Sequence, residues 1–388
     1  METETTTSND GAPTAAELDE RWARVVGRRG FLVGVGAAGA AALASGGLAT
    51  AGAALASSGR LSSGDAAILR FLAAAEIIET DLWQQYTELG GVNGGNPAYI
   101  AALENLDGDM PQYISDNTDD EHSHAAFLNA YLRAKGEDAV DLNEFRTLPS
   151  SKATGAKQVG RLTNLMNLNV DTSWYTRYRS GQNPDFGATF PQAVHIQGEP
   201  AIPLSDADTP PRMSQPVPPK TPQQRRMQAI ANTAGFHFAM IEQGGSSLYT
   251  TMSLKATDLE VLRIIVSIGG TEVNHFAVWH DKAGNAVAQP LAGVKDPETG
   301  VMFPDLNSPP FGGELFQTNL IMPEPTDFIS KGLPKCSVIR PSLDMNAGAR
   351  AVVAFLTSTG LFQGQSKKFF KAAHELAREA DAAQRGKR

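Results

Sequence analysis

Two pairs of glutamate and histidine, repeated at equal spacing, constrain the fold of this 388-residue chain more than any other feature. Glu121 precedes His124 by three residues, and Glu272 precedes His275 by three. Residues three apart on an α-helix lie on one face about one turn apart, so each pair presents a carboxylate and an imidazole in the same direction. Because the chain has only 7 histidines, this repetition is hard to assign to accident.

Two further segments carry a glutamate and a tyrosine at a second common spacing. Glu79 precedes Tyr86 by seven residues and Glu242 precedes Tyr249 by seven, which is two helical turns and again one face. The neighbours of all these polar residues on their helix faces are apolar or small: Leu72, Ala75, Leu82, Leu128, Tyr131, Phe238, Ala239, Ile265, Ile268 and Trp279. A carboxylate in the middle of an apolar stripe needs a partner, which predicts one shared buried site.

Apolar spacing and helix-end signals predict four long helices, which cover residues 65–89, 109–135, 221–254 and 257–282. Glycines follow three of them, and Thr221-Pro222 supplies an N-cap and a first-turn proline for another. A short helix is expected after Asn96-Pro97. The connection between the second and third long helices is far longer than the other two. The sequence therefore predicts an all-α, ferritin-like four-helix bundle with a long crossover connection.

The remaining segments lack sustained periodicity. The crossover, residues 141–220, becomes proline-rich after residue 184 and is expected to hold at most a short helix near 155–168. A second stretch rich in proline and glycine, 289–341, precedes two expected terminal helices over 345–358 and 362–385. The predicted domain organisation is a signal peptide over 1–56, a di-metal bundle over 57–285 with 141–220 as a long insertion, and a C-terminal extension of loop and helices over 286–388.

The N-terminal segment resembles a twin-arginine export signal. Arg28 and Arg29 come directly before an uncharged run of alanine, glycine, valine and leucine that reaches about Ala56. Small residues allow cleavage after Ala44 or after Ala56, and the second site is preferred because charged residues resume soon after it. The resemblance implies export through the Tat translocase to a periplasmic or extracellular location.

Composition excludes several classes of partner and cofactor. The 33 Lys and Arg against 42 Asp and Glu give a net charge of -9, which argues against binding a nucleic-acid backbone. The single cysteine, Cys336, excludes an internal disulfide, a four-cysteine zinc site and a cysteine-ligated iron–sulfur cluster. A metal in this chain must therefore be held by histidines and carboxylates.

The repeated pattern resembles the di-iron carboxylate proteins of the ferritin-like superfamily, in which two helices each give one glutamate and two others each give Glu-x-x-His. Among its branches, the chain looks most similar to bacterial relatives of the plant desiccation-related proteins, with a rubrerythrin-like core. The similarity covers residues 65–135 and 221–283. It implies six metal ligands, with Glu121 and Glu272 bridging two metals, Glu79 and Glu242 terminal, and His124 and His275 holding one metal each.

The same resemblance assigns the tyrosines and one glycine. Tyr86 and Tyr249 are expected to donate hydrogen bonds that orient Glu79 and Glu242. Gly245 stands where rubrerythrins commonly carry a further glutamate, which argues against a rubrerythrin-like ligand shift and efficient peroxide reduction.

Charge explains why four buried glutamates need metal ions. Together they would carry four negative charges without solvent, and two divalent cations neutralise them. Carboxylate oxygens with two imidazoles suit iron or manganese. The expected cofactor is two iron ions, with manganese or a mixed iron and manganese pair as the alternative.

Other polar residues have weaker interpretations. Glu76 lies one turn before Glu79, where it is either an extra ligand or part of an unrelated helix surface. The histidines at 122, 237 and 280 are interpreted as structural, and His195 as a loop residue or part of a lid. Two glycine pairs within expected helices, 244–245 and 269–270, suggest close helix approach beside the site.

Three classes of function remain open. The first is an exported oxidoreductase that reacts with dioxygen, peroxide or a small-molecule substrate, as a monomer or a homodimer. The second is a manganese catalase-like dismutase, against which the intact Glu272 and His275 pair argues. The third is a non-catalytic envelope or stress protein whose metals only hold the bundle together.

Overall fold

The computed structural model describes residues 59–172, 194–211, 218–309, 330–334 and 348–386. The predicted export signal over 1–56, with both candidate cleavage sites, lies outside the described residues, as does Cys336.

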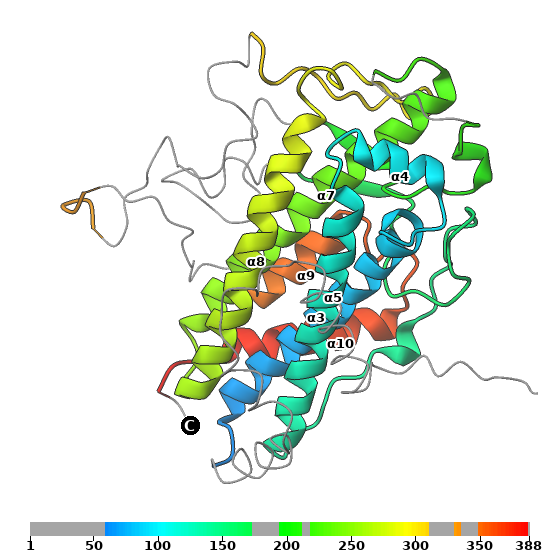
Figure 1. Ribbon diagram of the computed structural model, residues 1–388. Helices are drawn as coiled ribbons and strands as arrows, with labels where there is room; N and C mark the ends of the chain where they lie inside the picture. Colours follow the sequence, from blue (N-terminus) through cyan, green and yellow to red (C-terminus); the bar gives the residue numbers. More distant parts are fainter. Residues whose placement is uncertain (1–58, 173–193, 212–217, 310–329, 335–347, 387–388) are drawn as a thin grey trace, which may run out of the picture.

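Four long helices form the body of the molecule: α3 (Ser63–Gly90), α5 (Met110–Ala134), α7 (Pro222–Ser253) and α8 (Leu259–Asn285). Helix α3 packs along α5, and α7 packs along α8. Figure 1 shows the two pairs lying beside each other as one bundle. The predicted all-α, ferritin-like bundle is confirmed, and each helix begins and ends within three residues of its expected bounds.

Capping side chains set where these helices begin. The Ser62 hydroxyl accepts a hydrogen bond from Asp65 N at the start of α3, and the Asp258 carboxylate accepts two at the start of α8. Thr221 and Gln224 form a capping box ahead of α7, with Pro222 in its first turn. These contacts satisfy backbone N–H groups that have no partner within the helix. The short expected helix is also present, as α4 (Pro97–Glu104), with Asn96 as its N-cap.

Two apolar clusters divide the bundle along its length. One contains the aromatic stack of Trp83 with Phe238 and Trp279, whose ring centroids lie 4.7 and 5.3 Å from that of Trp83. The other contains Leu72 and Ile265, among others. On α5, α7 and α8 the predicted ligands lie between the residues of the two clusters. The polar residues therefore meet at one level of the bundle with apolar packing on both sides.

The described part of the crossover holds two short strands, β1 (Leu168–Val170) and β2 (Ile196–Glu199), which pair antiparallel. It also holds two single turns of 3-10 helix, Asn143–Phe145 and Asp206–Asp208. Over residues 155–168 the structure has no helix, which is within the expectation of at most a short one. Gly155 has φ +104°, and a Cβ at Gly160 would lie 2.0 Å from the Arg146 carbonyl oxygen, so both positions need glycine.

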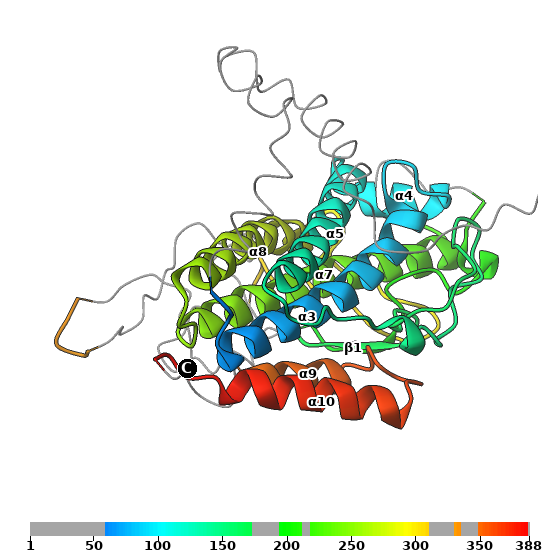
Figure 2. The ribbon, with the colours of Figure 1, turned by 90° about the horizontal axis from the view of Figure 1, so that it is seen from below.

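Two C-terminal helices follow, α9 (Ala349–Ser358) and α10 (Lys367–Ala382). Both terminal helices were expected, and the second begins later than expected. Gly360 and Gly364 have φ of +86° and +94°, which breaks the chain between the helices, and Ser366 then caps α10. Figure 2 shows α9 and α10 side by side beneath the bundle, where α10 contacts α3 and α9 contacts α7.

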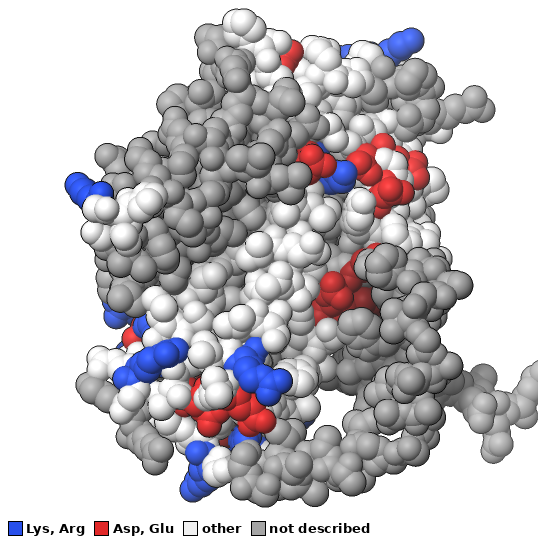
Figure 3. Space-filling view, turned by 60° about the vertical axis from the view of Figure 1, so that its left-hand side comes forward, with Lys and Arg blue, Asp and Glu red and all other residues white. Residues whose placement is uncertain are grey.

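Charged side chains on the face around α8 form small groups of both signs (Figure 3). Two ion pairs link α8 to its surroundings, Lys282 Nζ to Asp107 Oδ2 and Lys135 Nζ to Glu260 Oε2, each at 2.8 Å. Helix α8 is also the one described helix long and apolar enough to cross a membrane by length and composition. Its buried residues include Glu272 and His275, and it packs along α7, which is typical of a core helix in a bundle.

Candidate metal centre

The candidate site lies inside the bundle, and each of the four long helices contributes to it. Helix α3 gives Glu76, α5 gives Glu121 with His124, α7 gives Glu242, and α8 gives Glu272 with His275. The four carboxylates are at most 1% exposed, and the two histidines are 8% and 6% exposed. The site is thus a cluster of ionisable groups almost without access to bulk water.

These six residues form two overlapping groups of possible metal ligands. In the first group, oxygen or nitrogen atoms of Glu76, Glu121, His124 and Glu272 all lie within 4.8 Å of one another. In the second, the same holds for Glu121, Glu242, Glu272 and His275. Only Glu121 and Glu272 belong to both groups. Two carboxylates shared between two positions is the arrangement that a pair of bridged metal ions requires.

Distances around Glu121 support this bridging arrangement. Its Oε2 lies 3.0 Å from Nδ1 of His124, and its Oε1 lies 3.1 Å from Nδ1 of His275. Each oxygen of one carboxylate therefore faces the histidine of a different group. The same Nδ1 of His124 lies 3.3 Å from Glu76 Oε2 and 3.4 Å from Glu272 Oε1.

Hydrogen bonds from neighbouring side chains hold the terminal carboxylates. The Tyr249 hydroxyl donates to Glu76 Oε1 across the bundle. On the other side, Trp83 Nε1 donates to Glu242 Oε1 at 3.1 Å. The Asn117 amide donates to both Glu121 and Glu242, at 2.7 and 3.1 Å.

The outer nitrogen of one histidine is also held. Nε2 of His275 lies 3.0 Å from Asp120 Oδ2, which fixes the ring with Nδ1 toward the cluster. A carboxylate on the far nitrogen of a metal-binding histidine orients the ring and raises its basicity. Asp120 is a residue of the candidate site that sequence reasoning missed, although it directly precedes Glu121.

The proton affinities of the groups reflect burial and mutual charge. Burial raises the pKa of Glu76 to about 7, against the opposing effect of His124. Burial also raises the pKa of Glu272, and the charge of Glu121 adds to this. For Glu121 itself burial acts in the same direction, but the nearby His124 and His275 outweigh it and lower its pKa. For both histidines burial lowers the pKa, but the surrounding glutamates outweigh it and raise it.

The donor set fits two divalent cations. Apart from the approach of His124 Nδ1, neither oxygen of Glu272 nor Oε2 of Glu76 accepts a hydrogen bond from a described residue. A buried carboxylate without partners is costly, and a metal ion supplies the missing partner. Glu76, Glu121, Glu242 and Glu272 carry four negative charges when ionised, which two divalent ions balance. Carboxylate oxygens and imidazole nitrogens are ligands for iron or manganese.

Glycines on α7 and α8 give the site its close packing. A Cβ at Gly245 would lie 2.2 Å from Glu272 Oε2, so no side chain fits there while Glu272 keeps its place. A Cβ at Gly269 would lie 2.8 Å from Cβ of Tyr249. The close helix approach expected from the glycine pairs is therefore present at these two positions. A Cβ at Gly270, in contrast, meets no described atom within 4 Å.

Residues 64–285, more than half of the chain, match the family model of the ferritin-like domain. The chain belongs to the ferritin-like domain family. Comparison with curated proteins and with solved structures finds no match. The matched segment begins in α3 and ends with α8, so it holds all six clustered residues, while α9 and α10 lie beyond it.

Within this ferritin-like domain, five of the six residues predicted as ligands come together: Glu121, His124, Glu242, Glu272 and His275. Glu79, the sixth, is in neither group, and Glu76 occupies the corresponding place. Glu79 is partly buried and close enough to be influenced by the cluster, because burial and then the charge of Glu272 raise its pKa. That Glu79 binds metal stays a prediction.

The two tyrosines have different partners from those expected. Tyr249 bonds to Glu76 rather than Glu242, and the Tyr86 hydroxyl shares a 2.7 Å hydrogen bond with Nδ1 of His237. The signal that could have found Glu76 was the seven-residue spacing itself. Glu76 precedes Trp83 by seven residues, as Glu242 precedes Tyr249, and an indole N–H is as good a donor as a phenol.

The other histidines are outside the cluster. His237 and His280 are fully buried, His122 shares a 2.7 Å hydrogen bond with Gln84, and His195 is an exposed residue just before β2.

Proposed function

We propose that this protein is an exported oxidoreductase whose buried carboxylate and histidine cluster holds two metal ions that react with dioxygen or peroxide. The observation that supports this most is the pair of overlapping ligand groups that share Glu121 and Glu272. Iron is the metal we propose, with manganese or a mixed pair as the alternative, because the donor set is oxygen and imidazole without thiolate. When bound, two such ions supply a pair of electrons to the oxidant.

The chain's own residues do three things in this proposal. Glu76, Glu121, Glu242 and Glu272 would hold the two ions and balance their charge. His275, held by Asp120 on its outer nitrogen, keeps a fixed orientation through the reaction. The apolar clusters on both sides exclude bulk water, which strengthens every charge interaction inside.

Export is part of the proposal. Its support is the arginine pair Arg28-Arg29 ahead of an uncharged segment. The Tat translocase carries folded proteins, so the metals would be loaded before export. Changing Arg28→Lys together with Arg29→Lys should leave the folded, metal-loaded protein in the cytoplasm, as measured by fractionation. Normal export of that double variant would contradict the proposal.

The oxidoreductase proposal is tested on purified protein. Metal analysis should give two ions per chain, and stopped-flow mixing of the reduced protein with oxygen or with peroxide should change its visible spectrum. As a control, Glu137→Ala removes a surface carboxylate whose 3.0 Å ion pair with Arg70 is remote from the cluster, and should leave both results unchanged. Two bound metals that react with neither oxidant would overturn the oxidoreductase assignment and favour a structural metal site.

A further inference from the structure

An apolar cavity lies beside the carboxylate cluster. It is lined mainly by α3 and α7 of the bundle together with α9 and α10, with further residues at 142, 145, 361 and 362, and its volume is about 80 Å³. Side chains that line it include Phe71, Met240, Leu248, Val353, Leu356 and Leu376. One water molecule needs roughly 10–15 Å³ on this scale, so the cavity has room for a small organic molecule.

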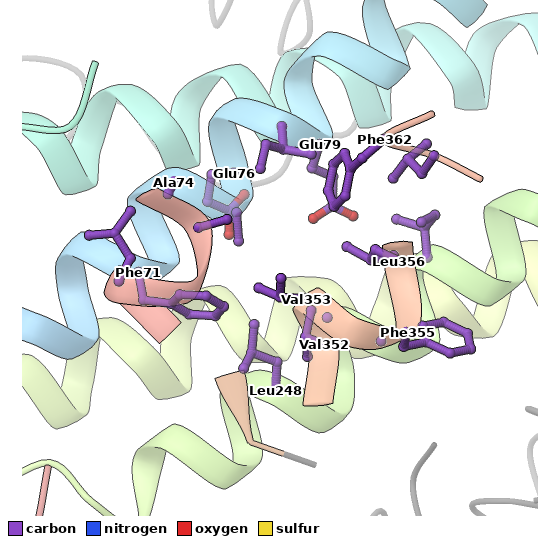
Figure 4. Close-up of a pocket in the computed structure, with 18 of the residues that line it drawn as sticks. Phe71, Ala74, Glu76, Glu79, Leu248, Val352, Val353, Phe355, Leu356 and Phe362 are labelled. Atoms are coloured by element: carbon purple, nitrogen blue, oxygen red, sulfur yellow. The ribbon is translucent and has the colours of Figure 1, made fainter. Parts of the chain in front are cut away.

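The cavity has a polar end at the metal site. Glu76, Glu79 and Tyr249 belong to its wall. Figure 4 shows Glu76 and Glu79 projecting from α3 toward the side that Val353 and Leu356 occupy. Oε1 of Glu79 is buried and accepts no hydrogen bond from any residue that the structure describes. A buried acceptor in an otherwise apolar space calls for a donor.

Water is a poor occupant of this space. An ordered water molecule needs two to four polar partners, and apolar cavities instead stay dry or take up apolar molecules. Apart from the three polar residues at one end, all the lining residues are apolar or glycine. A molecule with one hydrogen-bond donor and an otherwise apolar structure matches both the polar end and the apolar walls of the cavity.

The outer wall lies beyond the segment that matches the family. Helices α9 and α10 supply Val353, Leu356 and Leu376, and both helices lie beyond the segment 64–285 that matches the family. The bundle alone would leave this side of Glu79 uncovered. These helices thus cover a face of the ferritin-like domain and leave an apolar cavity that ends at the candidate metal site.

We propose that this cavity binds an apolar organic molecule that carries one hydroxyl group. The hydroxyl donates to Oε1 of Glu79, and the hydrocarbon part packs between α3, α7, α9 and α10. The contact with Glu79 places the hydroxyl end beside the metal site. Binding follows from the cavity and is measured without any oxidation step, so it can fail or succeed separately from the proposed oxidoreductase activity.

The first test measures binding of 1-alkanols of increasing length to the purified metal-loaded protein by isothermal titration calorimetry. Each added methylene should tighten binding about fourfold, which corresponds to about 0.8 kcal/mol, until the cavity is full. Methyl ethers with the same number of non-hydrogen atoms lack the donor and should bind about tenfold more weakly. In Glu79→Leu this preference for the alcohol should disappear.

Cavity-filling variants locate the binding site. Val353→Phe on α9 and Ala372→Leu on α10 add volume to two separate walls of the cavity, and each should weaken alkanol binding at least tenfold. Ala354→Phe is the matched control, because Ala354 is the next residue of α9 and is exposed, and it should bind alkanols as the unchanged protein does. Having two filling variants keeps the test valid if one of them does not fold.

The outcomes separate the two proposals. Alkanols that show no saturable binding, or that bind a folded filling variant unchanged, overturn the cavity proposal whatever the metals do. An alcohol preference that persists in Glu79→Leu overturns the role given to Glu79. Alkanol binding that is retained in a protein whose metals react with neither oxidant supports the cavity and contradicts only the proposed oxidoreductase function.

Discussion

The two halves of the bundle, α3 with α5 and α7 with α8, build matching sides of the candidate metal site. In each half a glutamate is followed seven residues later by an aromatic residue with a polar atom, Glu76 by Trp83 and Glu242 by Tyr249. Each aromatic donor crosses to the glutamate of the other half. Each glutamate therefore accepts a hydrogen bond from the other half, and these two bonds connect the helix pairs at the level of the candidate metal site.

The halves differ one turn further along. Three residues after Glu76 the first half has Glu79, and three residues after Glu242 the second has Gly245. Gly245 leaves the space that Glu272 fills, and Glu79 presents a carboxylate to the apolar cavity, whose wall includes both positions. The candidate site is therefore nearly symmetric in its clustered glutamates and asymmetric in the side chain that it presents to the cavity. This difference gives the cavity a carboxylate at one end, where the proposed organic molecule would meet the site.

The largest expected effect tests which residue of the first half is the ligand. Glu76→Gln should lower the metal content from two ions to about one, because it removes one charge and one oxygen ligand from the first group. Glu79→Gln is the matched control one turn away and should keep both ions. Metal analysis after dialysis against a weak chelator measures this. Loss of one ion in Glu79→Gln but not in Glu76→Gln would show that Glu79 is the ligand. Glu76 would then not be the equivalent of Glu242.

The second prediction concerns Gly245, the position where the halves differ. Gly245→Ala should displace the Glu272 carboxylate, since the new Cβ would lie 2.2 Å from its Oε2, and weaken metal binding by roughly 100-fold. Gly270→Ala is the control on α8, where a Cβ meets no described atom within 4 Å. That variant should bind metal normally and be more stable by up to about 1 kcal/mol, because alanine favours a helix over glycine.

Competition with a chelator of known affinity measures both constants. Normal metal affinity in Gly245→Ala would show that Glu272 can move without loss, and Glu272 would then not be a bridging ligand.

The sequence predicted a seven-residue spacing from a glutamate to an aromatic donor in each half of the bundle. It did not predict at which glutamate of α3 this spacing begins. Periodicity and helix-end signals located the four helices, because each has a long apolar face and most have a clear end signal, such as Thr221 or the glycines that follow three of them. Two Glu-x-x-His pairs located four of the clustered residues, and the seven-residue spacing from glutamate to tyrosine located a fifth, Glu242. A search for tyrosine alone, however, aligned Glu79 and Tyr86 with Glu242 and Tyr249, three residues away from the alignment that the structure shows.

Contacts between segments that are distant in the sequence could not be predicted from it. Nothing in the spacing along α10 indicates that Ala372 and Leu376 face a cavity beside Glu79, because this depends on how the chain returns after residue 348. The conformation of residues 155–168 likewise depends on contacts with a distant segment. The backbone N–H groups of Leu162 and Thr163 donate to Asp81 Oδ2, at 3.0 and 2.9 Å, so contacts with α3 determine that conformation.

The third prediction tests Tyr86, which the structure removes from the metal site. Its partner His237 is fully buried, and burial lowers the pKa of His237 to about 3. Below about pH 6.5 the unfolded chain takes up a proton that the folded chain does not, so stability falls as the pH falls from about 6.5 toward 3. At pH 4.5 this one group should lower the free energy of unfolding by about 3 kcal/mol.

His237→Gln should lose that part of the acid sensitivity, since glutamine does not titrate and can still bond to Tyr86. His374→Gln, at an exposed position of α10, is the control and should keep the loss seen in the unchanged protein. Denaturant unfolding at pH 7 and pH 4.5 gives the comparison. An equal acid loss in His237→Gln would mean that His237 is accessible to protons in the folded state.

The smallest effect tests whether the two crossing donors are equivalent. Tyr249→Phe removes the donor to Glu76, and Trp83→Phe removes the donor to Glu242. A hydrogen bond to a charged group contributes about 1.5 kcal/mol or more, so each variant should bind metal at least roughly tenfold more weakly. Tyr86→Phe is the control and should leave the affinity unchanged, because its hydroxyl bonds to His237.

Metal affinity, rather than stability, is the measurement to compare between these variants. Trp83→Phe also removes ring contact with Phe238 and Trp279 and so destabilises the fold for a second reason. If the two halves are equivalent in holding their glutamates, the two affinities fall by similar factors. A loss in Tyr86→Phe equal to that in Tyr249→Phe would instead support the pairing of Glu79 with Tyr86, and the symmetry between Glu76 and Glu242 would not hold.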